Sequence, residues 1–231
     1  MAKRMKEVFR CYYGLEESEY AVLWKDAIFI FDANVLLNLY RYKEKTRNEL
    51  LDVIDKLKNR LWIPHQVGLE FQRNRITVIN EQNKKFSEVK KIIKEHISGI
   101  ENDFNNIQID KKHANIDPTD IISAFKKIQE DFFSKLDELE NSSIRFNSND
   151  AIRDRLDDAI QENIGPQPEN QEYLDNLYKE GEQRFSSKIP PGYKDDSKGD
   201  KEFTFAGLKY KNKYGDLIAW KQIIAHARDV S

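Results

Sequence analysis

The hydrophobic pattern of the first third of the chain alternates between strand-like and helix-like stretches. Residues 27–31, AIFIF, are apolar on both faces, which is typical of a central strand in a parallel sheet covered by helices. A second short apolar run, Leu61 to Ile63, ends at Pro64. Helical spacing follows each run, over residues 34–41, 46–58 and 67–75. The order of strand, helix, strand and helix predicts an α/β fold with a parallel sheet.

From about residue 76 to residue 185 the strand pattern disappears. Apolar residues there form narrow stripes in a background rich in lysine and glutamate, which predicts long helices. The first stripe consists of Phe86, Val89, Ile93, Ile97 and Ile100, and the second of Ile121, Ile122, Phe125, Ile128, Phe132, Leu136 and Leu139. We expect the two stripes to pack on each other as an antiparallel helical arm. Shorter helices are predicted at 149–162 and 169–185.

The last part of the chain combines a loop with a helix. Residues 188–203 contain prolines, glycines and mixed charges without periodicity, which predicts a loop, and an amphipathic helix follows over 214–229.

Two capping signals mark helix starts further upstream. Thr46 and Glu49 have the spacing of a capping box, and Asp117 is placed to cap a helix with proline in its first turn.

Composition narrows the class of protein. Charged residues make up 34% of the chain and hydrophobic residues 39%, with too many Phe, Tyr, Ile and Leu for a disordered protein. The net charge of −2 favours no partner by itself, because only local clusters of Lys and Arg create the field that attracts phosphates. The single cysteine, Cys11, excludes an internal disulfide and a cysteine-based zinc site. We find no signal sequence and no long apolar run, and we expect a soluble, cytoplasmic protein without a membrane partner.

Three carboxylates stand where predicted helices begin. Asp32 directly follows the first predicted strand, Glu70 lies near the start of the helix after the second, and Asp216 opens the last helix. Each has a structural explanation, since Asp is a favoured helix cap and Glu70 suits a polar position of an amphipathic helix. In an open parallel sheet, however, ligands bind at the carboxyl ends of the strands, where these residues would converge.

Taken together, the three acids predict a cation site. Clustered carboxylates repel one another, and a bound cation relieves that repulsion. Oxygen ligands select Mg²⁺ or Mn²⁺, which also bind water and phosphate. The pattern therefore predicts the hydrolysis of phosphodiester bonds.

The stretches FDANVLLNLY, IPHQVGLEF and KYGDLIAW, in this order, resemble the motifs of PIN-like domain nucleases, in particular of a bacterial group with a long helical insertion. The resemblance implies a parallel sheet flanked by helices. Residues 1–80 and 188–231 would form this α/β core, and 81–187 the helical insertion or arm. The resemblance also implies metal-dependent cleavage of nucleic acid, RNA more than DNA, and a role such as a toxin or defence effector.

The resemblance assigns roles to four residues. Asp32, Glu70 and Asp216 would be the catalytic and metal-binding acids, and Asn34 would orient Asp32 or a bound water. PIN-like proteins carry a further acid after another strand, beyond the last helix, whereas this sequence ends at Ser231. We therefore expect a truncated fragment, an acid supplied in another way, or a weakened catalyst, because an incomplete ligand set lowers metal affinity before it disrupts a fold.

Four basic residues close to these motifs are candidates for substrate binding: Arg41, His65, Arg73 and Arg75. The planar guanidinium group can donate two parallel hydrogen bonds to one phosphate. Alternatively, such arginines pair with glutamates on the surface, and the histidine beside a proline marks the entry to a helix.

Two other functions compete with the nuclease. A noncatalytic assembly module would bury the apolar stripe of the arm against a second copy or another protein. A small-molecule phosphatase on a related scaffold would need a nucleophilic Asp-x-Asp pair, whereas the second position here is Asn34. The phosphatase is therefore the least favoured of the three.

Overall fold

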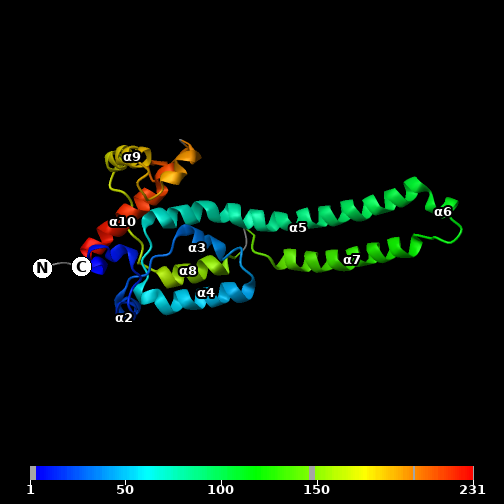
Figure 1. Ribbon diagram of the computed structural model, residues 1–231, viewed down its shortest axis with the longest axis horizontal. Helices are drawn as coiled ribbons and strands as arrows, with labels where there is room; N and C mark the ends of the chain where they lie inside the picture. Colours follow the sequence, from blue (N-terminus) through cyan, green and yellow to red (C-terminus); the bar gives the residue numbers. More distant parts are fainter. Residues whose placement is uncertain (1–3, 146–148, 200, 231) are drawn as a thin grey trace. The chain divides into compact units, whose positions relative to one another are not determined.

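The computed structural model describes residues 4–145, 149–199 and 201–230, which are mostly helical (Figure 1). The α-helices and strands are α1 (Met5–Val8), α2 (Glu17–Asp26), α3 (Ala33–Asn38), α4 (Glu44–Leu57), α5 (His65–Ile107), α6 (Ile109–Lys112), α7 (Thr119–Ser142), α8 (Ala151–Ile160), α9 (Gln171–Ser186), β1 (Glu202–Phe205), β2 (Leu208–Lys211) and α10 (Gly215–Asp229). Short 3₁₀ segments are η1 (Arg10–Tyr12), η2 (Lys58–Arg60), η3 (Tyr193–Lys198) and η4 (Asn212–Tyr214). Within these described ranges, every helix is too short or too polar to cross a lipid bilayer.

The chain folds into two compact units. Unit 1 comprises Met1–Asp32, Leu51–Gly68 and Asp158–Ser231, and unit 2 comprises Ala33–Leu50 and Leu69–Asp157. Compactness does not reveal which segment of a chain was inserted into which. The predicted division into a core and an insertion, with boundaries at residues 80 and 188, therefore stays a prediction.

The extended parallel sheet predicted from the sequence is not present in the described residues. Its place in unit 1 is taken by isolated parallel bridges between Phe29 and Leu61 and between Ile63 and Ile164. The segments are too short to extend the ladder: α3 begins soon after the first, and prolines, which lack the N–H that a strand donates, follow the other two at positions 64 and 166. The direction of pairing is parallel as predicted, but the sheet is not built.

A small antiparallel hairpin begins at the end of the predicted loop, and the sequence did not predict it. Strands β1 and β2 pair from Glu202 with Lys211 to Phe205 with Leu208. The two residues between them, Ala206 and Gly207, have φ angles of 47° and 81°. Positive φ at both positions is the geometry of a tight hairpin turn that follows the twist of its strands.

An aromatic cluster joins α9 to the start of α10 in unit 1. The ring of Tyr214, at the helix entry, lies 5.2 Å from the rings of both Tyr178 and Phe185. Gly181 permits this approach, since a Cβ atom there would lie 2.5 Å from the Tyr214 ring. Tyr214 and its neighbour Leu217 are completely buried, so the entry to α10 is firmly packed.

The buried apolar residues of unit 2 come mainly from α3, α5 and α8, and beyond them α5 and α7 form the arm. Lys126 of α7 pairs with Glu101 of α5 at 2.7 Å, while Lys90 of α5 pairs with Asp137 and, at 3.0 Å, with Glu140 of α7. The far end of one helix therefore meets the start of the other, and the two run side by side (Figure 1). The antiparallel arm is confirmed.

The two capping signals have different outcomes. Asp117 lies one residue before the cap position of α7, which Pro118 occupies, but its side chain accepts the N–H of Thr119 at 2.9 Å. The capping box of Thr46 and Glu49 is wrong, because α4 already begins at Glu44 and both residues lie inside it. The prediction failed because α4 extends about half a turn upstream of Thr46.

Candidate functional site

Asp32 follows the first extended segment of unit 1. The Phe29 N–H donates to the carbonyl of Arg60 at 2.7 Å, and the Trp62 N–H donates to the carbonyl of Phe29 at 3.0 Å. The chain then reaches Asp32, whose side chain is exposed, and α3 begins at Ala33. The carboxylate therefore stands at the point where an extended segment ends and a helix begins, and Asn34 follows, also exposed, in the first turn of that helix.

Glu70 lies in the second turn of α5 and is half-buried. Its nearest charged neighbour along the helix surface is Arg73, three residues further on. Partial desolvation lowers the pKa of the Arg73 guanidinium, and the negative charge of Glu70 opposes that shift. The two side chains thus present one carboxylate and one guanidinium group on adjacent positions of the helix.

Asp216 is exposed in the first turn of α10, directly after the buried Tyr214 and Gly215. The residue at the cap position of this helix is Tyr214, so Asp216 is not the cap. The backbone of Gly192 lies against it, since a Cβ atom on that glycine would be 3.0 Å from the Cβ of Asp216 and 3.5 Å from Oδ2. The segment between α9 and β1 therefore lies next to this carboxylate.

The three acids do not all fall in one unit. Asp32 and Asp216 belong to unit 1, and Glu70 belongs to unit 2. In the part of the chain that the structure describes, no group of three or more His, Cys, Asp or Glu side chains is arranged to hold a metal ion. A shared site for the three acids therefore stays a prediction.

The predicted substrate-binding residues differ in their surroundings. Arg41 is exposed; its guanidinium donates to Asn38 at 3.2 Å and lies 3.9 Å from Glu81. His65 begins α5 with its ring 5.9 Å from that of Phe205, and partial burial lowers its pKa. Its buried Nδ1 has no hydrogen-bond partner among the described residues. An imidazole in these surroundings is held neutral near pH 7, so it offers little charge to a phosphate.

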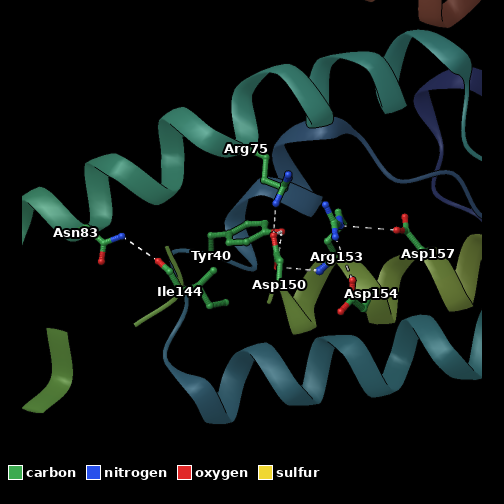
Figure 2. A network of polar contacts seen from close by, with 8 residues as sticks. All are labelled: Tyr40, Arg75, Asn83, Ile144, Asp150, Arg153, Asp154 and Asp157. Atoms are coloured by element: carbon green, nitrogen blue, oxygen red, sulfur yellow. Dashed lines mark hydrogen bonds and ion pairs between the residues drawn. The ribbon is translucent and has the colours of Figure 1, made fainter. Parts of the chain in front are cut away.

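Arg75 lies in a buried polar network of unit 2 (Figure 2). Its guanidinium forms an ion pair with Asp150, which precedes α8. The hydroxyl of Tyr40, just after α3, donates to Asp150 Oδ2 at 2.9 Å, and Asp150 Oδ1 accepts the N–H of Arg153 at 3.0 Å. Burial, and then the charge of Asp150, raise the pKa of the Tyr40 hydroxyl well above its usual value. Arg75 is therefore paired inside unit 2, and its predicted contact with substrate stays a prediction.

Sequence reasoning did not single out Asp150 or Tyr40. Asp150 lies at the start of the helix predicted over 149–162, and Asp is favoured as a cap, which is one of its roles. Its ion pair with Arg75 spans 75 residues of sequence, and no local pattern reveals a contact at that separation.

A cavity of about 250 Å³ lies in unit 1 beside α10. Trp62 and His226 stack beside it with ring centroids 4.0 Å apart and planes within 2° of parallel. Tyr173 adds another ring, and Glu169 and Asp229 add carboxylates. The described lining includes none of the predicted site residues, and its negative charge opposes the entry of a phosphate.

Comparison with known proteins gives one match. The family model described as PIN like domain matches residues 28–231. The match begins at the extended segment that precedes Asp32 and includes Glu70 and Asp216. Neither curated proteins nor solved structures gave a match.

Proposed function

The chain belongs to the PIN like domain family, whose members are generally nucleases, and from this premise we propose that it hydrolyses phosphodiester bonds, in RNA rather than DNA. The observation that carries the proposal is the extent of the match, which covers most of the chain and all three candidate acids. The local geometry of unit 1 supports it, because Asp32 follows a parallel-paired segment and Asp216 is exposed at the start of a firmly packed helix.

In this proposal Asp32, Glu70 and Asp216 are the catalytic acids, and Asn34 orients the carboxylate of Asp32. PIN domains typically use divalent metals. We assign Mg²⁺ or Mn²⁺ here because carboxylate oxygens are the ligands that these ions prefer. The preference for RNA and a role as toxin or defence effector rest on the family resemblance alone. A cytoplasmic location rests on the single cysteine, which suits a reducing compartment.

The basic residues contribute to substrate binding in different degrees. The exposed Arg41 and the Arg73 beside Glu70 have guanidinium groups that suit phosphate oxygens. His65, which is held neutral, suits a hydrogen bond to a sugar or base better than a phosphate contact. Binding through the two arginines would weaken as salt concentration rises.

The direct test is cleavage of single-stranded RNA by the purified protein with Mn²⁺. The Asp32→Asn variant, which keeps the shape but loses the charge, should lose cleavage while its circular dichroism stays unchanged. Asp26→Asn, at the exposed end of α2, is the matched control and should cut like the wild type. Single-stranded DNA of the same sequence should be cut more slowly. Equal cleavage by Asp32→Asn would remove this residue from the mechanism.

A second candidate function is assembly through the arm. One observation favours it: several large apolar side chains of α5 and α7 stay exposed, among them Ile92, Ile107 and Ile128. Light scattering at several protein concentrations and calorimetric titration with Mn²⁺ separate the two candidates. A concentration-dependent oligomer that binds no divalent ion would favour assembly over catalysis.

A further inference from the structure

The apolar side of α7 is divided into two stripes, whereas the sequence predicted one. The first stripe, Ile122, Phe125 and Leu136, is half-buried on the side of the helix whose ion pairs reach α5. The second stripe stays in solvent, with exposed fractions of 50% for Ile121, 64% for Ile128, 40% for Phe132 and 58% for Leu139. At 100° per residue these four side chains fall within about 40° of one another around the helix. They form a straight apolar face that α5 does not cover.

The exposed stripe has a symmetric spacing. Ile121 and Leu139 lie nine residues on either side of Glu130, and Ile128 and Phe132 lie two residues on either side of it. An antiparallel copy of the helix, centred on the same residue, would therefore place Ile121 opposite Leu139 and Ile128 opposite Phe132. An interface with a two-fold axis requires this self-complementarity, because the same surface serves both copies.

The charges of α7 favour the same orientation. Upstream of Glu130 the helix carries two lysines and one aspartate, and from Glu130 onward it carries five carboxylates and one lysine. Antiparallel pairing places the more basic half against the acidic half, whereas parallel pairing places the acidic halves together. Lys135 lies at the edge of the stripe, about 40° from its centre, and its aliphatic stem can cover apolar surface while its ammonium group reaches water.

We propose that the exposed stripe of α7 is a homodimer interface, in which α7 packs antiparallel on α7 of a second copy with its two-fold axis near Glu130. The proposal specifies the second candidate function, assembly through the arm: the partner is a second copy of the chain, and the register is centred on Glu130. It is independent of the nuclease activity, because its readout is the oligomeric state.

Sedimentation velocity over a wide range of concentration should show a monomer–dimer equilibrium. Ile128→Glu places a charge at the centre of the interface and should weaken dimerisation about tenfold or more, since burying an unpaired charge is costly. Ser123→Glu adds the same charge on the opposite, exposed face of α7 and should leave the equilibrium unchanged. A monomer at all concentrations, or a dimer unaffected by Ile128→Glu, would overturn the proposal.

An introduced charge pair tests the register without depending on one disruptive variant. Ile121→Lys and Leu139→Asp should each weaken the dimer several-fold, because each places an unpaired charge against an apolar side chain of the second copy. The double variant places opposite charges against each other across the interface and should recover much of the wild-type dimerisation. Circular dichroism of all three checks that the helix is intact. Failure of the double variant to recover, with the helix intact, would contradict the register.

Cross-linking distinguishes antiparallel from parallel pairing. In a Cys11→Ser background, a mixture of Ile121→Cys and Leu139→Cys chains should form a disulfide-linked dimer on oxidation, and neither variant alone should. Cross-linking of Ile121→Cys with itself would indicate parallel helices and would overturn the proposal.

Discussion

At the scale of single residues, the contact between Gly192 and Asp216 is the most informative feature of the candidate site. The glycine has a φ of +80°, a backbone conformation that residues other than glycine rarely adopt. A Cβ atom at this position would lie only 3.0 Å from the Cβ of Asp216. The segment after α9 therefore fixes the surroundings of one proposed catalytic acid.

Gly192→Ala should lower cleavage while the protein stays folded, because the new methyl group must displace Asp216 or the segment that carries it. Gly207→Ala is the matched control, since its φ is +81° but nothing lies within 4 Å of the added Cβ. Both variants carry the backbone strain, about 1–3 kcal/mol. Thermal melts should therefore shift similarly for the two, whereas an RNA cleavage assay should distinguish them. Equal activity would argue that Asp216 has no catalytic role.

His65 should make the protein sensitive to acid. Burial lowers its pKa in the folded state, so below about pH 6.5 the unfolded chain binds a proton that the folded chain does not. Stability is therefore complete above the unfolded pKa and falls as the pH drops toward the folded one. His65→Phe should flatten this part of the curve of melting temperature against pH, and the exposed His113→Gln should not. An unchanged slope in His65→Phe would contradict the assignment.

At the scale of elements, the network around Asp150 ties together segments that are far apart in sequence. Its carboxylate serves as the cap of α8, the ion-pair partner of α5 and the acceptor for the hydroxyl of Tyr40 (Figure 2). A group with this many partners is costly to remove, because the guanidinium of Arg75 would remain buried without its counter-charge.

Asp150→Ala should destabilise the protein by about 3–5 kcal/mol, the usual cost of breaking a buried ion pair. Asp154→Ala removes an exposed carboxylate 3.4 Å from Arg153 and should cost less than about 1 kcal/mol. Urea denaturation followed by circular dichroism measures both. Similar denaturation midpoints for the two variants would contradict the prediction, because the buried ion pair would then contribute no more stability than the exposed one.

Sequence patterns predicted these elements unevenly. The arm and the terminal helices follow from apolar spacing, because apolar residues recur at helical spacing along each of them and this pattern is local. The parallel sheet was overpredicted because Pro64 and Pro166 stop the ladder after single bridges. The hairpin at 202–211 was missed because its turn residues, Ala206 and Gly207, follow a stretch of loop-like composition. At the candidate site, motif order could place Asp32 and Asp216 at helix starts, but the burial of Arg75 depends on a distant partner.

At the scale of the whole molecule, the two compact units have apolar interiors of their own. Buried leucines, isoleucines and aromatic rings fill both of them. Burial of these apolar side chains is the main driving force for folding, and in the proposed function the divalent ion serves catalysis.

Removal of divalent ions should separate activity from folding. Addition of EDTA should abolish RNA cleavage and leave the melting temperature nearly unchanged, and excess Mn²⁺ should restore cleavage. Differential scanning fluorimetry and the cleavage assay on the same samples provide the comparison. A large fall in melting temperature with EDTA would mean that an ion holds the structure together.

The stack of Trp62 on His226 also provides a built-in optical probe. Trp62 is the buried one of the three tryptophans, and its indole lies flat against the imidazole of α10. If α10 detaches, the indole loses this stacking partner and becomes exposed to water, so the emission of Trp62 should shift to longer wavelength. With Trp24 and Trp220 replaced by phenylalanine, the emission of Trp62 would report, without any label, whether the helix that carries Asp216 is docked.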